Sequence, residues 1–290
     1  MSNSPRPAGI PGLSAIAGEY RSMLCDVWGV LHNGVSVYRP AADALMRFRA
    51  AGGSIILITN APRPRSVVAS QLDRLGVDRT AYDDIVTSGD VAHDFLARRP
   101  EARIFHLGPE RDRPIYDGLP NALVTEGEAD LISCTGLFDD TRETPDDYTE
   151  PLSRLARRGL PMLCVNPDKV VERGDQLVWC AGALAERYAA FGGETIIVGK
   201  PYAPIYEVAL RRLGEISLRP VRKSDVLVIG DGIETDVRGA FDQEIDILFI
   251  TDGIHADEFG AHDAPDPDAV HRFLGAAGLG ARNFAVRLAW

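Results

Sequence analysis

The chain is poor in cysteine and carries no cysteine pair at metal-binding spacing. Its 290 residues include four cysteines, each in or beside an apolar run: Cys25, Cys134, Cys164 and Cys180. No pair has the CxxC spacing of zinc or redox motifs, which argues against a zinc centre and a disulfide framework. We therefore expect four buried, free thiols in a reducing cytosol.

The sequence also lacks a long apolar run and an excess of positive charge. No run approaches the length of a membrane-spanning helix, and residues 1–18 have no basic segment followed by an apolar one. The net charge is −11, so no long-range field attracts nucleic acid or an anionic membrane. These absences predict a cytoplasmic protein that binds neither. Any positive charge for a phosphate ligand must be local.

Strand and helix patterns alternate along the chain, which is typical of an α/β fold with a largely parallel sheet. Glycine and proline punctuate these patterns at helix ends, as at Pro40 and Gly52. The strands expected in a core domain are 23–27, 54–59, 224–230 and 245–250, and the helices are 40–51, 65–75 and 234–241. We expect residues 261–268 to form a surface loop before a last short helix.

The middle of the chain has the pattern of a separate α/β unit. We predict a core in two parts, 1–86 and 197–290, interrupted by an inserted cap domain, 87–196. The strands expected in the inserted domain are 102–107, 130–134 and 160–165, and the helices are 91–97, 147–157 and 181–191.

Four polar motifs follow predicted strand ends. They are Asp26, Thr59-Asn60, Gly199-Lys200-Pro201, and Asp231 with Asp236. Carboxyl ends of parallel strands meet at one crevice, where open α/β sheets bind ligands. Two carboxylates there repel unless a cation lies between them, and hard oxygen ligands beside a phosphate suit Mg²⁺. A lysine, a threonine and an amide can then hold phosphate oxygens. Each motif alone is weak, but their combined order is informative.

This order resembles the haloacid dehalogenase superfamily, whose members are mostly Mg²⁺-dependent phosphatases with an aspartyl-phosphate intermediate. The resemblance covers nearly the whole chain. The inserted domain lies between the threonine and lysine motifs, as in the class IIA branch of sugar-phosphate, pyridoxal-phosphate and nitrophenyl-phosphate phosphatases. Three segments of the inserted domain are also similar to that branch: Thr87-Ser88-Gly89, Asn166-Pro167-Asp168 and Ala181-Gly182-Ala183.

The resemblance implies a Rossmann-like core, a Mg²⁺ cofactor and a set of site roles. By matching position, Asp26 is the nucleophile and a metal ligand, and the backbone carbonyl of Trp28 and Asp231 are further ligands. Asp236 holds the water shell of the metal or orients Lys200. Catalysis then rests on Asp26, Thr59 and Lys200, and substrate contacts on Thr59, Asn60, Asn166, Asp168 and Lys200. The implied substrate is a small phosphorylated metabolite, and a homodimer through the inserted domain is a further expectation.

Trp28 breaks the family pattern. The phosphatases carry there an aspartate that protonates the leaving oxygen, whereas an indole N–H is not acidic at neutral pH. Losing a general acid typically costs about 10²–10⁴-fold in rate. Three explanations stay open. The substrate has a good leaving group, such as a phenol, acyl phosphate or anhydride; another acid substitutes, either His32 or Asp168; or the protein binds a phosphorylated ligand and turns it over poorly.

We predict a hydrolase, a phosphatase that is slow or specialised because of Trp28, since the nucleophile and a complete metal site are present. One alternative is a phospho-ligand binding protein with vestigial catalysis. Another is a hydrolase of C–P bonds, which needs a lysine of the inserted domain for a Schiff base, and Lys169 is the only lysine there. A contact between Arg63 and the substrate phosphate is a further hypothesis.

Overall fold

The computed structural model describes residues 6–174, 176–218 and 220–290, which form two compact units. The core unit comprises Met1–Thr59, Ser70–Val86 and Tyr206–Trp290, and the inserted unit comprises Asn60–Ala69 and Thr87–Ile205. By this division the loop after residue 59 and the lysine motif belong to the inserted unit. The domain limits expected from the sequence put both in the core.

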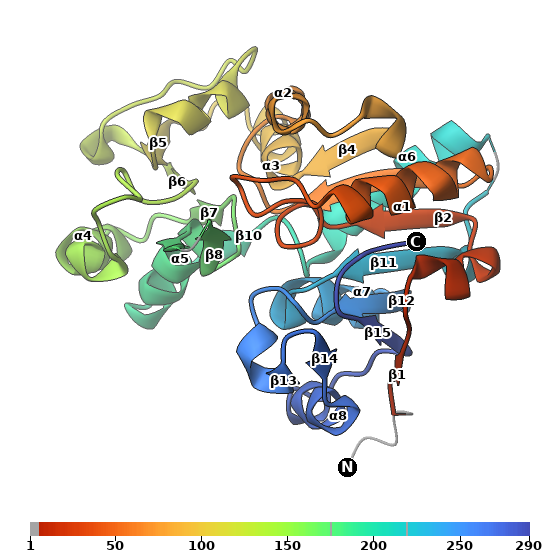
Figure 1. Ribbon diagram of the computed structural model, residues 1–290. Coiled ribbons are helices and arrows are strands. Elements are labelled where there is room, and N and C mark those ends of the chain that lie inside the picture. The colour runs from red at the N-terminus through yellow and green to blue at the C-terminus, as the bar shows by residue number, and fades with distance from the viewer. Residues whose placement is uncertain (1–5, 175, 219) are drawn as a thin grey trace. The chain divides into compact units, whose positions relative to one another are not determined.

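The core unit is built on a seven-stranded sheet in the order β1-β15-β12-β11-β2-β3-β4 (Figure 1). Neighbouring strands pair in parallel from β1, at one edge of the sheet, through β15, β12, β11 and β2 to β3. Strands β2 and β11, which pair with each other inside the sheet, are buried at every residue. This burial explains why their sequences are largely apolar rather than alternating. The strands are β1 (Ala8–Gly9), β2 (Ser22–Cys25), β3 (Ser54–Thr59), β4 (Asp84–Thr87), β11 (Val226–Gly230), β12 (Asp246–Ile250) and β15 (Asn283–Ala285).

Helices of the core follow the same local rules. Helix α1 (Arg39–Ala50) has a proline in its first turn and buries Ala41, Leu45 and Phe48, which recur at helical spacing. The others are α2 (Arg65–Leu75), α6 (Ala203–Ser217), α7 (Arg238–Asp242) and α8 (Pro267–Ala276). Both α2 and α6 begin in the inserted unit and continue into the core.

Two core segments differ from the sequence expectation. A π-helical turn, Ile233–Val237, precedes α7 where one helix over 234–241 was expected, because Val237 N–H bonds to the carbonyl of Gly232, five residues back. The predicted loop 261–268 contains a small hairpin of β13 (Gly260–Ala261) and β14 (Ala264–Pro265) before α8.

The inserted unit has its own four-stranded sheet in the order β10-β7-β6-β5, with parallel pairs throughout. Its strands are β5 (Ile104–Leu107), β6 (Leu131–Cys134), β7 (Met162–Cys164) and β10 (Thr195–Ile197), and its helices are α3 (Ser88–Ala97), α4 (Thr149–Arg157) and α5 (Ala181–Ala190). A separate antiparallel hairpin, β8 (Val170–Arg173) with β9 (Gln176–Trp179), was not anticipated. Together the two units confirm the predicted α/β class with a parallel core sheet and an inserted α/β domain.

Short 3₁₀ helices connect many of these elements. They cover Leu13–Ala15, Ala17–Glu19, Arg79–Ala81, Glu110–Tyr116, Glu126–Glu128, Pro145–Tyr148, Lys223–Asp225 and Ala256–Phe259. Among the described residues, no helix combines the length and apolarity that crossing a membrane requires.

All four cysteines are buried and lie outside any disulfide, as the sequence predicts. Burial raises the pKa of the Cys134 thiol to about 12. Such a thiol carries almost no thiolate at neutral pH and is therefore inert towards oxidants and metals.

His106 on β5 makes the inserted unit sensitive to acid. Burial, aided by Arg113, lowers the pKa of His106 from 6.5 to about 4. Between pH 6.5 and pH 4, His106 therefore binds a proton in the unfolded chain but stays neutral in the folded chain. The free energy of unfolding consequently falls as the pH drops from 6.5 towards 4. At pH 5 we expect a loss of roughly 2 kcal/mol from this residue. Urea unfolding at pH 7 and pH 5 should show a smaller acid loss in His106→Gln than in wild type; equal losses would contradict the assignment.

Candidate active site

Three carboxylates converge at the carboxyl edge of the core sheet. Asp26 directly follows β2 and donates its N–H to the carbonyl of Ile229, while Asp231 directly follows the neighbouring strand β11. Asp26, Asp231 and Asp236 are buried, and each offers one oxygen within 4.8 Å of the others. Buried carboxylates at this spacing repel one another strongly unless a cation neutralises them.

Two glycines determine where the Asp231 carboxylate lies. A Cβ added to Gly29 would come 2.3 Å from Asp231 Oδ2, and one added to Gly253 would come 2.1 Å from the same oxygen. Any side chain at either position would displace the carboxylate. Ile254 N–H donates a hydrogen bond of 3.1 Å to Asp231 Oδ2 and fixes its orientation. Gly253 and Ile254 follow β12, so sequence reasoning about the motif around Asp231 missed them.

Asp236 is held by the turn that follows β11. Its Oδ2 accepts a hydrogen bond of 3.1 Å from Gly232 N–H, and a Cβ on Gly230 would come 2.2 Å from its Cγ. The π-helical turn brings the side chain back over the strand end, so Asp236 is not the solvated first-turn acid that a helix alone would suggest.

The donor set fits Mg²⁺. Hard carboxylate oxygens are the ligands this ion prefers, and Asp26 and Asp231 would hold it directly with the Trp28 carbonyl, as the resemblance implies. Trp28 immediately precedes Gly29, which packs against Asp231, so its backbone lies close to the cluster. Thr59 ends β3, the strand beside β2, and is buried at the same edge of the sheet.

A second predicted group comes together within the inserted unit. The Asn60 side chain holds both backbone groups of Lys200: its Oδ1 accepts from Lys200 N–H at 2.7 Å, and its Nδ2 donates to the Lys200 carbonyl at 3.2 Å. Lys200 is only 2% exposed. Both observed bonds tie Asn60 to the lysine loop, and a contact between Asn60 and phosphate stays a prediction.

The three segments that resemble the class IIA branch meet around the same asparagine. Ser88 Oγ donates to Asn60 Oδ1 at 3.3 Å, and Asn60 Nδ2 also donates to Asp168 Oδ1 at 2.9 Å. Asn166 Oδ1 accepts from Asp168 N–H, and Gly182 N–H donates to the Asp168 carbonyl. The predicted substrate residues Asn60, Asn166, Asp168 and Lys200 thus form one hydrogen-bonded group.

The lysine loop requires glycine at position 199. Gly199 has φ +114°, and a Cβ there would come 2.1 Å from Ser88 Oγ. The positive φ and the contact both exclude larger residues. A cis peptide bond joins Lys200 to Pro201.

His32 does not have the properties of the missing general acid. It is buried, and its Nδ1 accepts a hydrogen bond of 2.8 Å from Gly34 N–H, which leaves the ring proton on Nε2. Burial also lowers the pKa of His32 to about 4. The ring is therefore neutral at pH 7 and has no imidazolium proton to donate.

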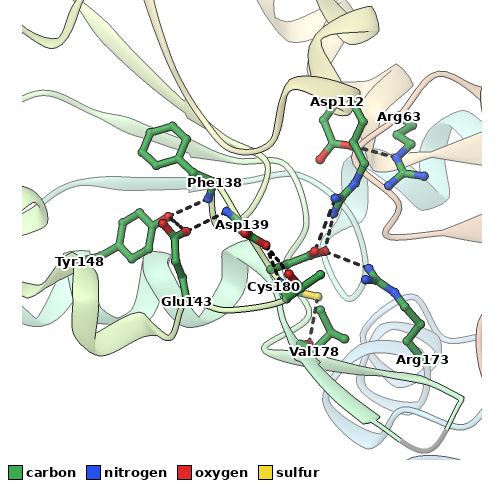
Figure 2. A network of polar contacts seen from close by, with 12 residues as sticks. Arg63, Asp112, Phe138, Asp139, Glu143, Tyr148, Arg173, Val178 and Cys180 are labelled. Carbon is green, nitrogen blue, oxygen red and sulfur yellow. Dashed lines mark hydrogen bonds and ion pairs between the residues drawn. The ribbon is translucent and has the colours of Figure 1, made fainter.

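Two other candidate side chains are engaged elsewhere in the inserted unit. Arg63 Nε donates to buried Asp112 Oδ1 at 2.8 Å (Figure 2). Lys169 Nζ is 2.6 Å from Glu186 Oε1, and both side chains are exposed. An activated Schiff-base lysine is usually desolvated in an apolar pocket, so this setting does not favour C–P bond hydrolysis through Lys169.

Two family models match the chain. One describes haloacid dehalogenase-like hydrolases and covers residues 23–119, and the other describes HAD-hydrolase-like proteins and covers residues 197–277. A crystal structure of a haloacid dehalogenase-like hydrolase from Brucella suis is 48% identical, with a TM-score of 0.87 over 97% of this chain and 100% of that one.

Two curated relatives are more distant. The 5′-nucleotidase YutF of Bacillus subtilis is 24% identical over 75% of this chain and 82% of its own length. The ribonucleotide monophosphatase NagD of Escherichia coli is 25% identical over 76% of this chain and 83% of its own length. With the Brucella structure matched over its whole length at 48% identity, these comparisons show that the chain belongs to the haloacid dehalogenase-like hydrolase family.

Proposed function

We propose that the chain is a Mg²⁺-dependent phosphatase of small phosphorylated metabolites, with Asp26 as the nucleophile. The observation that carries this proposal is the cluster of Asp26, Asp231 and Asp236, whose ligand atoms lie within 4.8 Å of one another. The relatives support the substrate class, since one is a 5′-nucleotidase and another a ribonucleotide monophosphatase.

In the proposed reaction an Asp26 carboxylate oxygen attacks phosphorus, and the bond from phosphorus to the leaving oxygen breaks. Bound Mg²⁺ would supply charge neutralisation between the carboxylates and the phosphate. Lys200 offsets the charge of the phosphoryl oxygens, and the Thr59 hydroxyl orients them. Water then attacks the aspartyl phosphate, which releases phosphate and restores the Asp26 carboxylate.

The leaving oxygen receives no proton from position 28. An alkoxide leaves poorly without protonation, whereas a phenolate, a carboxylate or a phosphate leaves readily. The neutral state of His32 leaves Asp168 as the remaining candidate for a substitute acid, and of the three explanations for Trp28 we adopt the first, a substrate with a good leaving group. The decisive screen measures phosphate release from aryl, acyl and alkyl phosphates with Mg²⁺. Release from aryl and acyl esters is expected; no release from the whole panel would favour a phospho-ligand binding protein.

Removal of the metal should stop the reaction. We expect EDTA to reduce phosphate release by more than about 10²-fold and added Mg²⁺ to restore it. Asp231→Asn should raise the Mg²⁺ concentration for half-maximal activity at least about tenfold, because it removes a charged ligand. Asp242→Asn is the matched control, since Asp242 is an exposed residue at the end of α7. Activity that survives the chelator would exclude the metal-dependent mechanism.

A further inference from the structure

The indole of Trp28 is held in place by the loop that follows it. Its ring packs against the His32 ring with centroids 5.0 Å apart and planes at 70°. On the benzo side lies Gly34, where a Cβ would come 2.6 Å from Trp28 Cζ2 and 2.8 Å from Cη2. Gly34 has φ +83°, so both its backbone conformation and the close approach favour glycine.

Hydrogen bonds within the loop fix the groups that hold the indole. Gly34 N–H donates to His32 Nδ1 at 2.8 Å, so the two residues that contact the indole are also bonded to each other. Gly29 N–H donates to the His32 carbonyl at 2.9 Å, and Tyr38 N–H donates to the Leu31 carbonyl at 2.8 Å. The indole therefore has little rotational freedom left to lose when a ligand binds.

The backbone of Trp28 lies close to the nucleophile. Trp28 is two residues from Asp26, so their Cα atoms are at most about 7.6 Å apart. Asp26 is buried, whereas Trp28 is only partly buried and keeps some of its surface open. At this separation, an ester whose phosphorus reaches Asp26 can extend its leaving group as far as residue 28.

We infer that Trp28 is a specificity-determining residue for phosphate monoesters of phenolic or heteroaromatic hydroxyls, and that His32 and Gly34 are its positioning residues. The inference rests on the proposed function and names its substrate class. Two independent properties of Trp28 lead to the same class. A fixed indole stacks more favourably on a planar aromatic ring than on a puckered one, and an aryl oxide leaves without the proton that Trp28 cannot supply.

Binding of two phosphonates separates stacking from leaving-group chemistry, because neither has a leaving group. Phenylphosphonate and cyclohexylphosphonate are of similar size and differ in planarity and aromaticity. Calorimetric titration in Mg²⁺ should give wild type a roughly three- to tenfold lower Kd for the phenyl compound. Trp28→Leu should reduce this ratio to about one, and Phe241→Leu, which changes an exposed aromatic residue on α7, should leave it unchanged.

Variants of His32 test the positioning role. His32→Ala removes the ring contact and should lower the phenyl preference. His32→Phe restores the ring but not the acceptor for Gly34 N–H, and it should recover part of that preference. A purely structural role for His32 would change both phosphonate affinities together and leave their ratio intact.

The inference is overturned if wild type binds the two phosphonates equally, if it binds neither at millimolar concentration, or if Trp28→Leu keeps the preference. These outcomes are distinct from failure of the proposed function. A wild type that prefers phenylphosphonate yet releases phosphate from no ester would refute the phosphatase and retain the aromatic site. A wild type that releases phosphate, loses this activity in Asp26→Asn and shows no preference for phenylphosphonate would support the phosphatase and refute the aromatic site.

Discussion

Asp26→Asn is expected to abolish phosphate release, with a fall in kcat of at least about 10⁴-fold. The amide is nearly isosteric with the carboxylate, but it is a far weaker nucleophile and a neutral metal ligand. Removing a covalent nucleophile eliminates the stepwise route entirely, which makes this the largest expected effect of a single change. Steady-state assays on an aryl phosphate with saturating Mg²⁺ measure it.

The matched control is Asp242→Asn, which makes the same chemical change at an exposed position of the core unit. It should leave kcat within about twofold, as surface substitutions usually change little. Circular dichroism of both variants shows whether the fold is intact. Turnover of Asp26→Asn close to that of wild type would exclude the covalent mechanism.

Trp28→Asp is expected to raise kcat/KM on alkyl phosphates by about 10²-fold or more, because it introduces the general acid that the chain lacks. Aryl esters should gain little from the acid, since their leaving groups need no proton, and they should lose the stacking surface. The substitution therefore inverts the preference between the two classes. Parallel kcat/KM measurements on one aryl and one alkyl ester test this.

Trp28→Asn is the control for this change, because it has nearly the size of the aspartate variant but no acidic proton. It should lose aryl activity without a gain on alkyl esters. Both variants leave the packing partners of the indole, His32 and Gly34, without their contact, so that loss of stability cancels in the comparison. Equal alkyl rates in the two variants would show that protonation of the leaving group does not limit the reaction.

Much of the core was predictable because its elements carry strong local signals. The β-branched run 54–59 and the amphipathic stretch 65–75 coincide with β3 and α2. The sequence pattern that indicates a buried parallel strand or an amphipathic helix is contained within a few neighbouring residues. The convergence of Asp26 with Asp231 was also predictable, since it follows from the parallel arrangement of strand ends.

Other features depend on contacts between distant segments and leave no local signal. Strands β1 and β15 are short, and they are strands only because each pairs with a neighbour far away in sequence. Gly253 meets the Asp231 carboxylate across a strand and a loop, and Asn60 bonds to the backbone of Lys200 from 140 residues away. Trp28 was visible as a break in the pattern, but its immobilisation depends on the fold of the loop up to Gly34.

The most direct test of the central claim is to look for phosphate on Asp26. Wild type mixed with an aryl phosphate and Mg²⁺ is quenched in acid within one turnover, digested and analysed by mass spectrometry. The proposed mechanism predicts a phosphorylated peptide that contains Asp26, sensitive to hydroxylamine and absent from Asp26→Asn. Turnover in wild type with no phosphorylated peptide, or with the phosphate on another residue, would contradict it.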